Sequence, residues 1–195
     1  MKNIRIESQI DKYAPFSEKL KAIYAAMDKK YKIAADYYDF HCTGCKDNCC
    51  LTRFYHHTFL EYFCIIEGYD TLQTEQQAEV KKRAAEVCRK AADADEKGLA
   101  VQLMCPLNVE GLCLLYAYRP MICRLHGIPH ELRKPGQSAA HHPGCEAFTE
   151  QCEEKGCFKF DRTPFYIEMA SLERDMKQAL GTARKLKMTV AQMLA

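Results

Sequence analysis

Apolar side chains recur at intervals of three and four residues in four stretches of the chain, as they do along one face of an amphipathic helix. The four stretches are residues 14–38, 58–68, 74–97 and 163–181. Pro15 suits the first turn of the first helix, and Gly68 and Gly181 suit the ends of the second and the fourth. The pattern predicts a mainly α-helical fold. A last short apolar turn at residues 190–194 could dock on the body of the protein or on a partner.

Between residues 99 and 118 the helical period is lost, and a short two-stranded hairpin fits the pattern better. The turn would pass through Asn108 and Gly111, both common turn residues. Cys105 and Cys113 flank this turn, so a hairpin would bring them close enough to face one site. The following block, residues 126–145, is rich in glycine, proline and histidine and is predicted to be a loop.

Chain length, composition and net charge limit the size of the fold and the kinds of partner that we expect. The chain has 195 residues, 48% of them hydrophobic, which suggests a small single domain covering residues 1–195. With 28 basic and 26 acidic residues the net charge is +2, which lacks the clear excess of basic residues that is typical of nucleic-acid-binding domains. The first residues lack an apolar segment, and no later run approaches the ~18 apolar residues of a membrane span. We therefore expect no membrane partner and a cytoplasmic location.

The 12 cysteines are the chemical signature of the sequence. The cytosol keeps thiols reduced and a chain of this length does not need disulfides, so metal ligation is the preferred explanation. Six disulfides would be the alternative in an exported protein. Cys42 and Cys45 form a C-x2-C knuckle, whose two thiolates can converge on one ion. Cys49 and Cys50 are adjacent, and because neighbouring side chains diverge, they suit two metals or two corners of a cluster.

Two arginines lie near the next cysteines, in the stretch Tyr118-Arg-Pro-Met-Ile-Cys-Arg124. Arg119 and Arg124 could lower the pKa of thiols, donate hydrogen bonds to sulfur and offset the charge of a thiolate-rich cofactor site. The alternative is that both are surface arginines at the end of a short helix.

The cysteine blocks together resemble the YkgJ-type cysteine-cluster family, whose members are described as zinc- or iron-chelating proteins. The resemblance covers about residues 40–146 and implies a metal-binding core with eight cysteine ligands, while the helices at 14–38 and 163–181 would be additions. The implied ligands are Cys42, Cys45, Cys49, Cys50, Cys105, Cys113, Cys123 and Cys145. One departure is that three residues, where the family often has two, precede the double cysteine. This leaves the ligand roles of Cys49 and Cys50 open.

Eight thiolates could hold two zinc ions, two cubane iron-sulfur clusters or one larger cluster. Simple zinc modules usually present two knuckles, whereas here one knuckle is followed by dispersed cysteines, a layout that favours an iron-sulfur cluster. Zinc remains the alternative cofactor. Because the ligand segments are far apart in sequence, ligation would supply much of the folding free energy, and the metal-free protein is expected to be partly unfolded.

The remaining cysteines and the histidines have plainer interpretations. Free cysteine is often buried, so Cys64 and Cys88, on helical apolar faces, are predicted to be structural. Cys152 and Cys157 are interpreted as bystander thiols, although they could complete a further site. The seven histidines are interpreted mainly as polar surface residues, with metal ligation as the alternative; they are His41, His56, His57, His126, His130, His141 and His142.

Two classes of function remain. The first is a metal-binding protein with a structural, electron-transfer or metal-handling role. The second is a cluster-dependent modification enzyme, since flagellin lysine methylases resemble this family in their cysteine motif. The sequence has no Gly-rich nucleotide loop, nucleophile elbow or H-E-x-x-H motif. A nucleic-acid-binding zinc module would need a basic face that the composition does not indicate.

Overall fold

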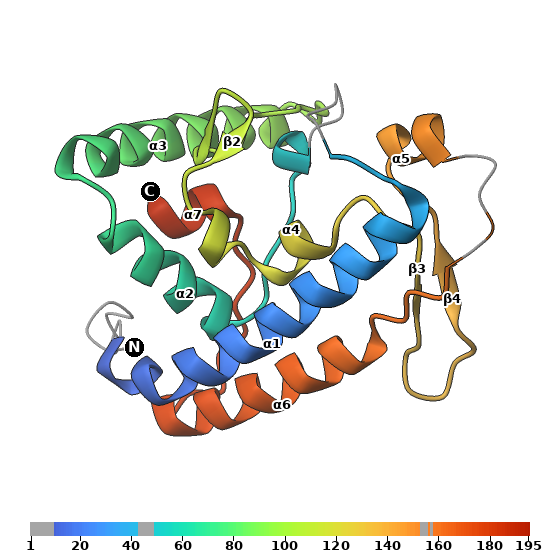
Figure 1. The fold of residues 1–195 in the computed structure, drawn as a ribbon. Helices are drawn as coiled ribbons and strands as arrows, with labels where there is room; N and C mark the ends of the chain where they lie inside the picture. The colour runs from blue at the N-terminus through green and yellow to red at the C-terminus, as the bar shows by residue number, and fades with distance from the viewer. Residues whose placement is uncertain (1–9, 43–48, 153–155, 157) are drawn as a thin grey trace. The chain divides into compact units, whose positions relative to one another are not determined.

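The computed structural model describes residues 10–42, 49–152, 156 and 158–195. The fold is mainly helical, as the sequence predicts (Figure 1). The helices are α1 (Ile10–Tyr38), α2 (Phe59–Asp70), α3 (Thr74–Glu96), α4 (Met121–Leu125), α5 (Glu146–Cys152), α6 (Thr163–Leu180) and α7 (Val190–Leu194). The other described elements are the 3-10 turns η2 (Cys49–Leu51) and η3 (Tyr116–Tyr118) and the hairpins β1 (Asn108–Val109) with β2 (Leu112–Cys113) and β3 (His130–Leu132) with β4 (Ala140–His142).

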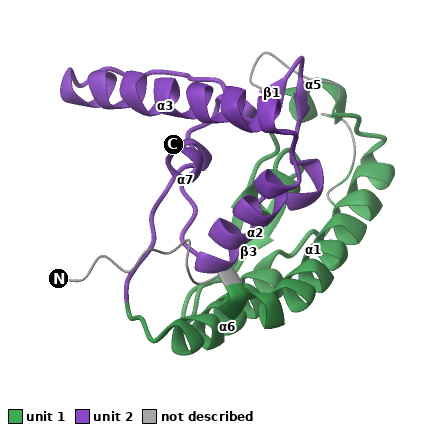
Figure 2. Cartoon of the chain, turned by 90° about the vertical axis from the view of Figure 1, so that its left-hand side faces the viewer, with its two compact units in different colours: residues 1–47, 121–183 green, residues 48–120, 184–195 purple. Residues whose placement is uncertain are grey.

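Contacts divide the chain into two compact units, which Figure 2 shows in different colours. Unit 1 combines residues 1–47 with 121–183, and unit 2 combines residues 48–120 with 184–195. Each unit therefore joins segments that are far apart in the sequence.

In unit 1, α1 packs along α6 and against the short α4, and Figure 1 shows the two long helices side by side. The predicted apolar faces form this core, because their residues at intervals of three, four and seven are buried. They are Leu20, Met27 and Ala34 of α1 and Met169, Leu172, Met176 and Leu180 of α6. Gly181 takes φ of 65° and ends α6, as predicted.

The start of α1 differs from the prediction. The helix begins at Ile10, so Pro15 lies inside it and not in its first turn. Proline there removes one intrahelical N–H donor. Tyr13, only 2% exposed, is anchored in the core before the proline, and burial of this earlier turn offsets the lost hydrogen bond.

Unit 1 also contains a hairpin where a loop was expected. β3 and β4 are antiparallel, with His130 opposite His142 and Leu132 opposite Ala140. Their residues are half-buried or exposed on both faces, so no alternation of apolar and polar residues reveals them in the sequence. The prediction of a loop over this block was therefore wrong, because backbone pairing alone defines these strands.

In unit 2, α7 packs against α3 and α2. Four of its five residues, Val190, Ala191, Met193 and Leu194, are buried. The segment before it is paired to the chain preceding α2, where His56 and Met188 exchange two backbone hydrogen bonds of 2.8 and 3.1 Å. Of the two expectations for the C-terminal turn, docking on the body of the protein is confirmed. The predicted bounds of α3 are also confirmed.

Gly68 does not end α2, contrary to the prediction, since the helix continues to Asp70. A Cβ atom on Gly68 would lie 2.5 Å from Cγ of Tyr118, whose ring packs directly on the helix backbone. Close packing of an aromatic ring, and not helix termination, therefore requires glycine here.

Gly68→Ala is expected to lower the free energy of unfolding by roughly 1–3 kcal/mol, because the added methyl overpacks the contact with Tyr118. In an unhindered helix interior the same change would stabilise by about 1 kcal/mol. Urea unfolding measures the difference. In a Tyr118→Ala background, where the ring is absent, Gly68→Ala should stabilise the protein, and additive effects of the two substitutions would contradict this explanation.

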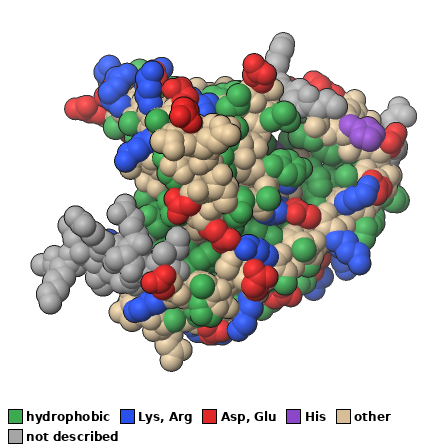
Figure 3. Space-filling view, turned by 60° about the vertical axis from the view of Figure 1, so that its left-hand side comes forward, with side chains coloured by type: hydrophobic (Ala, Val, Ile, Leu, Met, Phe, Trp, Pro, Cys, Tyr) green, Lys and Arg blue, Asp and Glu red, His purple; other side chains and the backbone are tan. Residues whose placement is uncertain are grey.

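None of the helices in the described part of the chain is long and apolar enough to cross a membrane. On the face drawn in Figure 3, basic and acidic side chains lie interspersed and are not gathered by sign. The expectation that the protein does not bind nucleic acid stays a prediction.

Candidate metal centre

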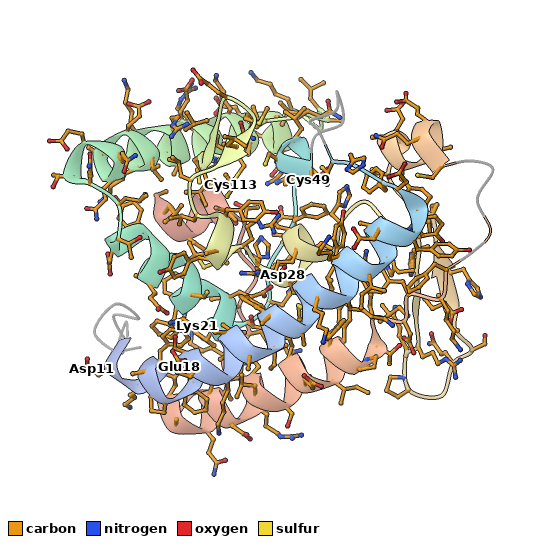
Figure 4. All side chains as sticks on the ribbon, in the orientation of Figure 1. Asp11, Glu18, Lys21, Asp28, Cys49 and Cys113 are labelled. Atoms are coloured by element: carbon orange, nitrogen blue, oxygen red, sulfur yellow. The ribbon has the colours of Figure 1, made fainter. Side chains whose placement is uncertain are left out.

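Four of the predicted ligands belong to unit 2: Cys49, Cys50, Cys105 and Cys113. Cys49 and Cys50 begin the 3-10 turn η2, and the backbone N–H of Cys105 donates to the carbonyl of Cys50 at 2.8 Å. Figure 4 labels Cys49 on η2 and Cys113 on β2. Charge on Cys50 raises the pKa of both Cys105 and Cys113, so these thiols lie within electrostatic reach of one another. Two segments that are distant in sequence thus meet at their cysteines.

The hairpin predicted from the sequence is confirmed and fixes the second segment. Asn108 pairs with Cys113, and Val109 pairs with Leu112. The two turn residues, Glu110 and Gly111, have φ of 51° and 86°, as a tight two-residue hairpin turn requires. The N–H of Asn108 also donates to the carbonyl of Cys105 at 3.0 Å. Backbone hydrogen bonds therefore hold Cys105 and Cys113 on either side of one turn.

The thiols differ in their tendency to ionise. A hydrogen bond from Cys49 lowers the pKa of Cys50 from 9.0 to about 6, with smaller contributions from Asn108 and Arg119, in opposition to burial. Burial raises the pKa of Cys105 to about 12 and also raises the pKa of Cys113. Cys50 therefore ionises more readily than Cys105 and Cys113.

Arg119 is held beside these thiols. Its Nε donates to the carbonyl of Tyr116 at 3.0 Å, and its guanidinium lies 3.5 Å from the centroid of the Tyr116 ring. Its positive charge lowers the pKa of Cys50 and of Cys113. Whether Arg119 also binds a cofactor stays a prediction, but the charge is present at the thiols.

Arg124, in unit 1, is 5% exposed and connects α4 to α1. Its Nη1 lies 2.6 Å from Oδ2 of Asp28, which Figure 4 labels on α1, and its guanidinium stacks 4.1 Å from the centroid of the Tyr24 ring. The described contacts therefore give Arg124 a structural role, and its predicted cofactor role stays a prediction.

The other four predicted ligands belong to the residue ranges of unit 1. Cys42 is exposed, Cys123 lies half-buried on α4, and Cys45 lies outside the described residues. The N–H of Cys145 donates to the carbonyl of Gly127 at 2.9 Å, and Gly127 takes φ of 109° at this close approach. The eight predicted ligands thus divide into four for each unit.

Within the described part of the chain, no three His, Cys, Asp or Glu side chains are grouped as a metal ion requires. Ligation in unit 2 would therefore have to draw the four thiols closer together. The predicted set of eight ligands stays a prediction.

The cysteines outside the predicted ligand set are mostly covered. Cys64 is buried, with its Sγ 3.9 Å from the carbonyl of Tyr118, and Cys152 is buried and donates to the carbonyl of Tyr38 at 3.5 Å. Cys88 is half-buried on α3, and burial raises its pKa. Cys157 lies outside the described residues. Burial agrees with the interpretation of Cys64 as a structural residue.

Sequence reasoning missed two buried polar residues. His56, interpreted as a surface residue, is 2% exposed, and its Nδ1 lies 3.8 Å from Oε1 of the buried Glu61. Glu61 also accepts a hydrogen bond from the Thr58 hydroxyl at 2.7 Å. Thr58 followed three residues later by Glu61 is a capping-box pattern, but nothing in the sequence indicates that its carboxylate turns inward towards a histidine.

Arg162, at the N-terminus of α6, is the second buried polar residue that sequence reasoning missed. It is 2% exposed, and its Nη2 donates to the carbonyls of Leu125 and Ile128. Burial lowers its pKa to about 10, and its charge contributes to the lowered pKa values of His126 and His130, for which burial is the larger cause. It stands between Asp161 and Thr163 as an ordinary charged residue before a helix, so nothing in the sequence indicates its burial.

Comparison of the chain with protein-family models, with curated proteins and with solved structures finds no match. The resemblance to YkgJ-type proteins rests on the cysteine motif alone.

Proposed function

We propose that the protein binds a metal centre through cysteine thiolates, and that Cys49, Cys50, Cys105 and Cys113 are the ligands in unit 2. The observation that carries this proposal is the meeting of the η2 turn and the β1–β2 hairpin at these four cysteines. An iron-sulfur cluster is the proposed cofactor, with zinc as the alternative. The proposed role is structural, electron-carrying or metal-handling.

The chemistry of the residues fits such a group. Sulfur donors suit zinc and iron-sulfur clusters better than they suit hard cations. Arg119 supplies a positive charge that offsets part of the negative charge of a thiolate set. When bound, the metal would supply a cross-link between two chain segments and, in a cluster, one-electron chemistry. The thiols of Cys105 and Cys113 must lose their protons for this to occur.

The remaining predicted ligands, Cys42, Cys45, Cys123 and Cys145, are proposed on the family resemblance alone. If they bind metal as well, the four cysteines in each unit match the four thiolate ligands of one cubane cluster, whose separate corners suit the adjacent Cys49 and Cys50, whereas one zinc ion would need both of these thiolates at a single metal. The number of metal ions per chain therefore distinguishes a protein with metal in one unit from a protein with metal in both units.

Metal affinity is expected to rise steeply with pH. Burial keeps Cys105 and Cys113 protonated at neutral pH, so ligation by both displaces two protons. Cys49, whose S–H donates to Cys50, must lose a third proton, so between about pH 7 and 9, where Cys50 is already ionised, the apparent dissociation constant for zinc should fall roughly a thousandfold per pH unit. Calorimetric titration in two buffers of different ionisation enthalpy counts the released protons. Binding without proton release would contradict this assignment of ligands.

The proposed function is tested by anaerobic purification followed by metal analysis, a visible spectrum and an assay of acid-labile sulfide. Iron with sulfide supports the cluster, and colourless protein with zinc supports the alternative. Cys105→Ser should lower the metal content per chain, whereas the matched control Cys88→Ser, on α3, should not. Metal-free native protein, or equal metal content in both variants and the native chain, would overturn the assignment.

A further inference from the structure

Asn108 carries a buried donor beside the thiols of unit 2. The residue is 9% exposed, and its Nδ2 has no hydrogen-bond partner within usual limits among the described residues. A buried amide N–H left without an acceptor costs on the order of 1–3 kcal/mol. Such a group in a native structure calls for an acceptor that another state of the protein supplies.

The orientation of this amide is fixed by the hairpin. Its Oδ1 accepts a hydrogen bond from the N–H of Gly111 at 3.1 Å. The amide oxygen therefore faces the turn, and Nδ2 points away from the turn. The backbone of Asn108 is held on three sides: its N–H donates to Cys105, its carbonyl accepts from Arg83 Nη1 at 2.9 Å, and its strand partner is Cys113. Rotation of the amide to find another partner would break the contact with Gly111.

Sulfur is the acceptor that lies nearby. The side-chain amide of Asn108 lies beside the Cys50 side chain, towards which it acts as a hydrogen-bond donor, and Cys50 is tied to the same region by the backbone bond from Cys105. The contact does not meet the usual distance and angle limits of a hydrogen bond, since Nδ2 remains without a partner within them. A small inward movement of the Cys50 side chain during ligation would complete it.

We propose that Asn108 is a positioning residue of the metal centre, which donates its side-chain N–H to Sγ of metal-bound Cys50 and thereby increases metal affinity and tunes the electronic properties of the thiolate. This inference rests on the proposed metal centre. Donors in the outer shell of metal sites hold ligands in orientation and withdraw electron density from sulfur. Asn108 would do so from a turn that also fixes Cys105 and Cys113.

Asn108→Asp tests the inference, because aspartate keeps the acceptor for Gly111 but has no N–H to donate. Leu112→Asp is the matched control: it adds the same negative charge to the same hairpin at a side chain that is 74% exposed. The probe is Co²⁺, titrated into each metal-free protein under anaerobic conditions. The readouts are stoichiometry, dissociation constant and the position of the thiolate-to-cobalt charge-transfer band.

Asn108→Asp should bind cobalt with the native stoichiometry but about 10–100-fold more weakly. Its charge-transfer band should move to lower energy, because the sulfur electrons are no longer stabilised by the N–H group. Leu112→Asp should keep the native band and lose little affinity. If both variants match the native protein, or if both change equally, the inference is overturned while the metal centre stands. Absence of cobalt binding by the native chain would overturn the proposed function itself.

A second measurement uses the native chain and so does not depend on the folding of a variant. With an NMR-active cadmium isotope bound, the side-chain N–H of Asn108 should show scalar coupling to cadmium through sulfur and slower exchange with solvent. A side-chain amide resonance of Asn108 unchanged by cadmium, in protein whose cysteine resonances do change, would overturn the inference.

Discussion

If the proposed metal centre is present, its removal by a chelator is expected to unfold part of unit 2 and leave the rest folded. The η2 turn and the β1–β2 hairpin contain few buried apolar residues, so ligation would supply much of their stability. The core of α2, α3 and α7 is held by buried side chains such as Phe63, Val80 and Leu194. The loss of local stability should be at most the roughly 10–16 kcal/mol that structural zinc binding supplies.

Hydrogen exchange measures this prediction residue by residue. After chelation, the amides of Cys105, Asn108 and Leu114, all hydrogen-bonded within the hairpin region, should exchange much faster. The amides in the middle of α3 should keep their protection. Cys105→Ser, which is expected to bind metal poorly, serves as the control and should already exchange fast without chelator. Uniform protection before and after chelation would contradict a stabilising role of the metal.

Replacement of Arg162 by alanine is expected to destabilise unit 1 by about 3–5 kcal/mol, since it leaves a cavity and removes the donor to two buried carbonyls. Leu125 and Ile128 are themselves 1% exposed, so water cannot easily replace the guanidinium. Thermal or urea unfolding measures the change. Arg174→Ala is the matched control, because Arg174 lies on the same helix, is exposed and donates to the Ser171 hydroxyl at 3.0 Å. It should change stability by less than about 0.5 kcal/mol.

Arg162→Met separates the two causes of this loss. Methionine fills most of the volume but donates no hydrogen bond, and removal of a buried charge relieves the cost of its desolvation. We therefore expect a smaller loss than with alanine. If neither alanine nor methionine lowers the free energy of unfolding, the two carbonyl contacts contribute little to stability. If both lower it by the same large amount, the lost hydrogen bonds and not the cavity are the cause.

The long helices could be predicted from sequence because their apolar faces follow the helical period over many turns. The bounds of α3 and the end of α6 at Gly181 match this expectation. The same reasoning failed at Gly68, where the glycine accommodates the ring of Tyr118 rather than a helix end. A contact between residues so far apart leaves no local signal. The β3–β4 hairpin was missed for a related reason, because its polar strands show no alternation.

The candidate site was partly visible in the sequence. Turn residues between Cys105 and Cys113 indicated the hairpin, and the backbone pairing confirms it. The burial of Asn108 could not be predicted, because asparagine is an ordinary turn residue whose side chain usually faces solvent. Likewise, the different pKa values of Cys50 and Cys105 depend on burial and on neighbours from distant segments. Spacing identifies candidate ligands, but only the fold shows which of them are held near one another.

The division of the chain also bears on the order of events during synthesis. Cys49, Cys50, Cys105 and Cys113 all leave the ribosome before residues 184–195, which carry α7 and complete unit 2. Until that segment docks, the pairing of His56 with Met188 cannot form. Contacts of such long range also slow folding. A nascent chain therefore presents all four thiols before its own core is complete, so the interval just after translation is the time when insertion of the proposed cofactor and accidental oxidation would compete most directly.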